Sequence, residues 1–233
     1  MLKASTKKSS VVLLSGGLDS CTTLALAREV TDVHLCLSFF YGQRHDKELR
    51  AARRIAGHYN TPWYLVRLNT IRPLLAQHTA LVRGGLEVPT DRPLEEMTNI
   101  PRSYVPGRNT MMLAIAQSIA EALHIDRIYA GFNAVDYSGY PDCRPEFVIQ
   151  WNKLAELATE RGVNKDPILV VTPIIGLRKK AIVERAVDLK APIRLTWSCY
   201  QGKRFACGRC DSCLIRLKAF EEAGLKDPCQ YAL

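Results

Sequence analysis

Long hydrophobic runs are missing from this chain. Its apolar stretches are far shorter than the roughly 20 residues that a membrane-spanning helix needs. The first ten residues carry three lysines, but no apolar segment long enough for a secretory signal peptide follows them. We also find no internal repeat and no low-complexity segment. We therefore expect a cytoplasmic protein with no membrane partner.

Acidic residues are scarce relative to basic ones. The chain of 233 residues has 23 Asp and Glu against 32 Lys and Arg, a net charge of +9. This excess fits a polyanionic ligand, either a nucleotide or a nucleic acid, and does not choose between them. Hydrophobic residues make up 47% of the chain, enough for a large core, so disorder is disfavoured. The length suits one domain with appendages.

A glycine-containing turn near the start carries the strongest signal. The segment Ser15-Gly16-Gly17-Leu18-Asp19-Ser20 follows the apolar run Val11–Leu14 and precedes a helical pattern. Such a turn exposes backbone N–H groups beside the positive end of a helix, which makes a phosphate cradle. It lacks the lysine of the G-x-x-x-x-G-K-[ST] loop, and it is not G-x-G-x-x-G. A plain turn with a serine N-cap is the alternative.

The pattern S-G-G-x-D-S resembles the signature of the N-type ATP pyrophosphatases, which cleave ATP between its α and β phosphates. Asp19 is an oxygen ligand suited to Mg²⁺. We predict ATP contacts from nine residues of this turn and its flanks: Leu14, Ser15, Gly16, Gly17, Leu18, Asp19, Ser20, Cys21 and Thr22.

Apolar runs and helical patterns alternate along the first 190 residues. Strands are expected at 11–14, 32–40, 63–68, 127–132 and 168–173, and helices at 20–30, 45–58, 111–123, 146–161 and 178–189. This alternation predicts an α/β fold, a doubly wound five-stranded parallel sheet with the first strand central. We divide the chain into a Rossmann-like domain (1–190) and a tail (191–233). A proline- and glycine-rich insertion, 70–105, is expected to form a lid or side wall.

Two predicted helices begin with cations. Arg108 and Lys179 lie at helix N-termini, where a positive charge opposes the macrodipole and an anionic ligand would compensate. We therefore assign Arg108 and Lys179, with Asp19, as candidate catalytic residues.

Substrate-binding residues are expected where strands end at the ligand-facing edge of the sheet. A dense polar loop at 133–145 suits a planar, polar heterocycle, although a solvated loop is the alternative. The predicted substrate residues are Tyr41, Gln43, Asn109, Asp136, Tyr137, Asp142 and Arg144.

Four of the eight cysteines crowd into fifteen residues near the C-terminus: Cys199, Cys207, Cys210 and Cys213. Four thiolates satisfy a tetrahedral structural Zn²⁺ and leave no open position for catalysis. Disulfides are disfavoured in the cytosol, and the spacing differs from that of an iron–sulfur motif. We predict a small zinc-binding helical tail that the metal staples together.

These features occur together in the 7-cyano-7-deazaguanine synthase family of the queuosine and archaeosine pathways, which this chain resembles from about Val11 to Leu225. The resemblance rests on S-G-G-L-D-S, Tyr41–His45, Val105–Asn109, the loop Asp136–Pro145 and the cysteine quartet. It implies an adenine nucleotide alpha-hydrolase-like fold, a homodimer, and an ATP-dependent C–N ligase. The family turns 7-carboxy-7-deazaguanine and ammonia into the nitrile, using ATP and Mg²⁺. No direct tRNA binding is expected.

Two rival functions stay open at this point. A tRNA-modifying ATP pyrophosphatase, which thiolates a base or forms lysidine, shares the glycine turn but needs a tRNA-binding domain or a catalytic cysteine pair. A zinc-knuckle nucleic-acid-binding protein without catalysis would explain the cysteines but not Asp19 or the polar loop. A glutamine-dependent amidotransferase is disfavoured, because no second domain for making ammonia is evident.

Overall fold

The structure is a computed structural model, and it describes residues 7–93, 100–134 and 139–232. Strands are β1 (Ser9–Leu13), β2 (Asp32–Phe40), β3 (Trp63–Arg67), β4 (Arg127–Ala130) and β5 (Leu169–Val171). Helices are α1 (Leu18–Val30), α2 (Lys47–His58), α3 (Arg72–Leu75), α4 (Arg108–Ala122), α5 (Pro145–Ala158), α6 (Glu160–Val163), α7 (Lys179–Asp188) and α8 (Asp211–Glu222). Short 3₁₀ turns lie at Asn69–Ile71, Ala76–His78, Pro141–Cys143 and Ile193–Leu195.

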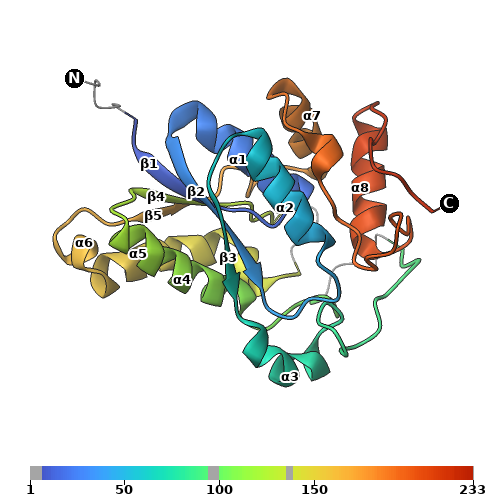
Figure 1. The fold of residues 1–233 in the computed structure, drawn as a ribbon, viewed down its shortest axis with the longest axis horizontal. Helices are drawn as coiled ribbons and strands as arrows, with labels where there is room; N and C mark the ends of the chain where they lie inside the picture. Colours follow the sequence, from blue (N-terminus) through green and yellow to red (C-terminus); the bar gives the residue numbers. More distant parts are fainter. Residues whose placement is uncertain (1–6, 94–99, 135–138, 233) are drawn as a thin grey trace.

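All five strands form one parallel sheet in the order β3-β2-β1-β4-β5 (Figure 1). Val12 of β1 pairs with Cys36 on one side and with Tyr129 on the other, so β1 is central. The order reverses at β1, which places a topological switch point at the carboxyl end of that strand. The predicted doubly wound parallel sheet is confirmed.

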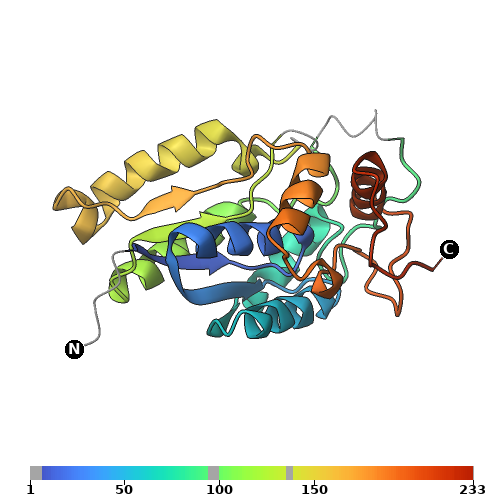
Figure 2. The same cartoon turned by 90° about the horizontal axis from the view of Figure 1, so that it is seen from above.

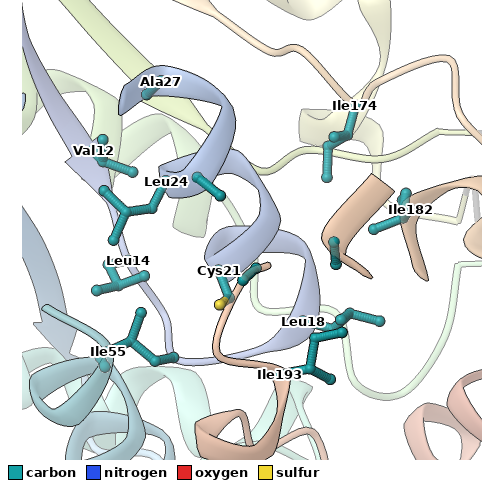
Figure 3. Close-up of a cluster of buried hydrophobic side chains, with 14 of the residues drawn as sticks. Val12, Leu14, Leu18, Cys21, Leu24, Ala27, Ile55, Ile174, Ile182 and Ile193 are labelled. Carbon is teal, nitrogen blue, oxygen red and sulfur yellow. The ribbon is translucent and has the colours of Figure 1, made fainter. Parts of the chain in front are cut away.

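Helices cover both faces of the sheet, and each face has its own apolar core. Val12 and Leu14 pack with residues of α1, α2 and α7, among them Leu24, Ile55 and Ile182 (Figure 3). Val11 and Leu13 point the other way, toward α4 and α5. This alternation follows from the two-residue period of a strand. Because both faces are buried, β1 is apolar at successive positions.

The described residues of the insertion, 70–93 and 100–105, contact both the sheet domain and the tail. They include the short α3 and a 3₁₀ turn but no strand. Arg44 donates to the carbonyl of Ala80 at 2.5 Å, and Thr90 bridges to Cys210 of the tail. Leu81 lines a cavity of about 300 Å³ at the carboxyl edge of the sheet. The described part of the insertion is therefore bonded both to the loop that follows β2 and to the tail.

The tail shares the core of the sheet domain. Ile193, Ala219 and Phe220 belong to the same buried cluster as α1 and α7. The backbone N–H of Trp197 donates to the carbonyl of Gly16 at 2.9 Å. Both views place α8 beside α7 at the end of the molecule away from α6 (Figures 1 and 2). The division of the chain at residue 190 stays a prediction. None of the described helices is long and apolar enough to cross a membrane.

Replacing Gly16 by alanine should destabilise the fold more than the same change at Gly17. Gly16 has φ of +91°, and an added Cβ would lie 2.1 Å from the carbonyl oxygen of Glu48. A strained backbone and a backbone clash together predict a loss of at least about 3 kcal/mol in the free energy of unfolding. At Gly17 the nearest atom would be 3.5 Å away, so we expect less than about 1 kcal/mol. Urea denaturation of both variants measures this difference, and equal losses would contradict it.

Candidate active site

A cavity of about 300 Å³ lies at the carboxyl edge of the sheet. It begins where β1, β2 and β4 end, at Leu14, Phe39 and Gly131. Open parallel sheets bind ligands at this edge. The wall also draws on α1, α2, α4, α7 and the tail. Its polar and aromatic lining includes Ser15, Asp19, Ser20, Tyr41, Glu48, Arg108, Asn109, Tyr140, Lys179, Trp197, Tyr200 and Arg216.

The glycine turn is held by its two serines. The hydroxyls of Ser15 and Ser20 are 3.0 Å apart, the N–H of Gly16 donates to Ser20 Oγ, and that of Gly17 donates to Ser15 Oγ. Gly17 is the N-cap of α1, so the positive end of that helix faces the cavity. The two serine hydroxyls therefore hold the turn in a fixed shape beside the positive end of α1.

Two of the nine predicted ATP contacts face the core instead of the cavity. Cys21 is fully buried, its sulfur lies within the first apolar cluster (Figure 3), and burial raises the pKa of its thiol to about 12. The hydroxyl of Thr22 donates to the carbonyl of Leu18 at 2.9 Å. The α1 helix turns these two side chains away, whereas Leu14, Ser15, Gly17, Leu18, Asp19 and Ser20 line the cavity. The ninth residue, Gly16, is buried and does not line it.

Asp19 and Lys179 form an ion pair at the cavity wall. The two residues lie in the first turns of α1 and α7 and are partly buried. Lys179 is the first residue of its helix, as expected, and the Asp19 carboxylate supplies the anion that this helix end favours. The sequence predicted both residues for the site, and the structure shows that they meet each other there.

Arg108 stands between two tyrosines. Its guanidinium carbon lies 5.9 Å from the ring centre of Tyr41 and 5.8 Å from that of Tyr140, and it donates to the Tyr41 hydroxyl at 3.5 Å. Arg108 is the first residue of α4 and lines the cavity. Stacking on aromatic faces orients a guanidinium while leaving its N–H groups able to donate to a ligand.

The anion at the start of α4 comes from the protein itself. Asp142 accepts the backbone N–H of Asn109 at 2.9 Å, and the Asn109 amide donates to the carbonyl of Asp142 and to Cys143 Sγ. Asp142 is buried and does not line the cavity. In this structure it fixes the α4 N-terminus and, through it, the position of Arg108.

The other predicted substrate residues divide into three groups. Tyr41, Gln43 and Asn109 line the cavity. The side-chain amide of Gln43, however, accepts a hydrogen bond from the Tyr41 N–H and donates one to the Phe39 carbonyl, at the end of β2. Arg144 is exposed at the N-cap of α5 and does not line it. Asp136 and Tyr137 lie outside the described residues.

Several lining residues escaped the sequence-based prediction. Glu48, in the first turn of α2, has a pKa raised to about 7, chiefly by burial and against the favourable charge of Arg108. Trp197, Tyr200 and Arg216 come from the tail. The local sequence around Glu48 and Trp197 does not indicate a binding site. Only the packing of distant segments brings these side chains to the cavity.

The four cysteines of the tail come together as predicted. Their Sγ atoms all lie within 4.8 Å of one another, and those of Cys207 and Cys213 are 3.9 Å apart. Backbone N–H groups donate to Cys199 Sγ and Cys207 Sγ, as in a site built for thiolates. Four sulfurs at this separation fit a tetrahedral Zn²⁺ with Zn–S bonds of about 2.3 Å.

Comparison with known proteins places this chain among close relatives. The model of the family described as queuosine biosynthesis protein QueC matches residues 9–224. The 7-cyano-7-deazaguanine synthase of Anaeromyxobacter dehalogenans is 46% identical over 236 residues, covering 100% of both chains. That of Myxococcus xanthus is 45% identical over 229 residues, covering 96% of this chain and 97% of its own. Among solved structures, a 4-thiouridine synthetase bound to RNA and ATP is 19% identical over 79% of this chain and 41% of that one, with a TM-score of 0.48.

Proposed function

Because the chain belongs to the queuosine biosynthesis protein QueC family, we propose that it converts 7-carboxy-7-deazaguanine and ammonia to 7-cyano-7-deazaguanine at the expense of ATP. The observation that carries the reaction type is that the glycine turn, the Asp19–Lys179 ion pair and Arg108 all line one cavity. An activating nucleotide and an acid substrate would meet in that cavity.

The proposed reaction uses ATP to convert a carboxylate oxygen, which leaves poorly, into a good leaving group. A carboxylate resists attack because its oxygen leaves poorly, whereas adenylation lets that oxygen leave as AMP. Ammonia then gives the amide. A second adenylation, now on the amide oxygen, lets that oxygen leave as AMP and yields the nitrile. Each adenylation releases pyrophosphate. The protein must therefore hold the phosphates of ATP and stabilise the negative charge that grows on the departing pyrophosphate.

The glycine turn and its two charged neighbours fit this task. The hydroxyls of Ser15 and Ser20, which line the cavity, and the positive end of α1 would favour the pyrophosphate. The Asp19 carboxylate offers the oxygen donors that Mg²⁺ prefers, and the metal, when bound, would neutralise phosphate charge. Lys179 would then exchange its Asp19 partner for a phosphate oxygen, which the flexible lysine chain allows.

The aromatic part of the cavity fits the heterocycle. Tyr41 and Tyr140 offer apolar ring faces, and Arg108 between them offers donors for the carboxylate that is to be adenylated. A planar acid needs such a combination of flat walls and one oriented cation. Arg108 and Tyr140 are proposed contacts, together with the predicted Tyr41 and Asn109. For Asp142, which caps α4, we propose an indirect role through Arg108.

The cysteine quartet holds Zn²⁺ in a structural role in this proposal. Four sulfur ligands fill the tetrahedron, so no position stays open for substrate. The bound ion would fix the segment that contributes Trp197, Tyr200 and Arg216 to the cavity. We further propose a cytoplasmic homodimer that handles the free heterocycle and does not itself bind tRNA.

One assay tests the proposed function directly. The zinc-loaded protein is incubated with ATP, Mg²⁺, ammonium and 7-carboxy-7-deazaguanine, and the nitrile is sought by mass spectrometry together with AMP and pyrophosphate. We expect all three products, with two AMP for each nitrile. Absence of both AMP and nitrile would reject the proposal, and salt-dependent RNA binding without ATP turnover would favour the zinc-knuckle alternative.

A further inference from the structure

The cavity contains two carboxylates among its described lining residues, and they differ in their surroundings. Asp19 is paired with Lys179. Glu48 makes no hydrogen bond and no ion pair within 4 Å to any residue that the structure describes. A carboxylate that faces a cavity without a partner is available to a ligand, because burial makes an unsatisfied charge costly and a partner is therefore favoured.

Glu48 lies close to the glycine turn and interacts electrostatically with Arg108. Its backbone carbonyl packs against Gly16 so closely that no Cβ fits between them. Its carboxylate acts electrostatically on Arg108 and on the hydroxyl of Tyr41. Glu48 thus lines the same cavity as the glycine turn and Arg108, the proposed carboxylate-binding residue.

The proposed reaction requires a proton acceptor at the nitrogen. Ammonium, the dominant form near neutral pH, has four N–H bonds and no lone pair, whereas the nitrile nitrogen has none. Ammonium loses one proton before it attacks and a second as the amide forms and AMP leaves. The amide nitrogen loses its last two protons as its oxygen is adenylated and the C–O bond breaks. Every bond change at carbon is therefore accompanied by proton removal from the same nitrogen.

Resting on the proposed function, we infer that Glu48 is a catalytic residue that accepts protons from the ammonium nitrogen and from the amide nitrogen formed from it. The carboxylate takes the proton as its own O–H and passes it to water between steps, so that no oxidant, reductant or further co-reactant is needed. A negatively charged oxygen also attracts the ammonium ion, which would collect the nucleophile at the adenylated carbon.

The charge environment of Glu48 is consistent with this role. Burial raises the pKa of Glu48 to about 7, and the positive charge of Arg108 opposes the rise. A base with a pKa near the working pH can both take up and release a proton. Among the cavity-lining residues that the structure describes, Glu48 combines such a pKa with a carboxylate that makes no hydrogen bond or ion pair to another described residue.

Separate assays of the two half-reactions test the inference on the zinc-loaded, full-length chain. Acid-dependent ATP–pyrophosphate exchange reports the first adenylation and needs no ammonia. We expect Glu48→Gln to retain this exchange and to form amide and nitrile from ammonium about 10²- to 10⁴-fold more slowly. Hydroxylamine, which is neutral near pH 7, should still capture the adenylate as hydroxamate at close to the wild-type rate.

A matched control is Glu29→Gln, the same change at an exposed position outside the cavity, which should leave both assays unchanged. Loss of exchange in Glu48→Gln, with ATP binding intact, would overturn the inference in favour of a substrate-binding role. Unchanged ammonium-dependent rates would also overturn it. Absence of exchange in the wild-type protein would instead reject the proposed function, so the two failures are distinguishable.

Discussion

Replacing Cys210 by serine is expected to abolish zinc binding and, with it, most of the ATP-dependent activity. Cys210 is fully buried among the other three sulfurs. A structural Zn²⁺ contributes an apparent binding free energy of about 10 to 16 kcal/mol, and loss of one ligand removes much of it. The free energy of folding of a domain is of similar size, so the tail cannot keep its packing without the metal.

The reason for the expected loss of activity is the position of the tail. Trp197, Tyr200 and Arg216 line the cavity, and the backbone N–H of Trp197 donates to the carbonyl of Gly16 in the glycine turn. If the tail loosens, the wall and one hydrogen bond of the glycine turn are lost together. Without zinc, the thiols of the quartet hold their protons with unequal strength. Hydrogen bonds from neighbouring thiols lower the pKa of Cys199, and the pKa of Cys210 is raised to about 12, chiefly through its hydrogen bond to Cys199.

Metal analysis, thermal unfolding and ATP–pyrophosphate exchange check this prediction. Cys210→Ser should lack stoichiometric zinc, unfold at a lower temperature and lose exchange activity by at least about tenfold. Cys229→Ser is the matched control, because Cys229 lies beside the quartet but is not one of its four ligands. It should keep both zinc and exchange. A Cys210→Ser protein without zinc that exchanges at the wild-type rate would contradict the proposed connection between tail and cavity.

Removing the charge of Lys179 is expected to lower the rate of nitrile formation by about 10²- to 10³-fold, the usual effect of losing one group that stabilises transition-state charge. Lys179 is the cation of α7 that reaches Asp19 at the cavity wall. If it turns to phosphate only as the α–β bond breaks, the effect falls on kcat more than on the KM for ATP.

Lys180→Gln is the control for Lys179→Gln. Lys180 is the next residue of the same helix, but it is half exposed and pairs with Glu184 at 3.7 Å, so its change should leave kcat within about twofold, since an exposed pair is worth little. Steady-state kinetics with both variants measure the difference. Equal effects of the two substitutions would show that general charge, not the position of Lys179, matters.

Asp19→Asn provides a second test of the same pair. It removes both the ion-pair partner of Lys179 and the proposed Mg²⁺ ligand, so it should also lower kcat by about 10²-fold or more. Because the two residues act in one site, the double variant should be far less impaired than the product of the single effects. Multiplicative losses would indicate independent roles for Asp19 and Lys179.

Much of the fold was predictable from the sequence because its signals are local. A parallel strand that is buried on both faces must be apolar at successive positions, as Val11–Leu14 is, and the helices between such strands show their own period. The glycine turn was recognisable because Gly16 needs a positive φ that other residues avoid. The cysteine quartet was recognisable because metal ligands on one short segment must be closely spaced.

The tertiary structure decided which side chains share the cavity. Asp19 and Lys179 are 160 positions apart, and only the packing of α1 against α7 makes them an ion pair. The polar loop suggested Asp142 as a substrate residue, whereas in the fold its carboxylate accepts the Asn109 N–H and so caps α4. Glu48 gave no signal at all, since a glutamate in a basic helix is ordinarily solvated. The sequence alone determined the elements, the glycine turn and the cysteine quartet, because short-range geometry requires those residues. Which groups face one another across the cavity depended on contacts between distant segments, which no local pattern records.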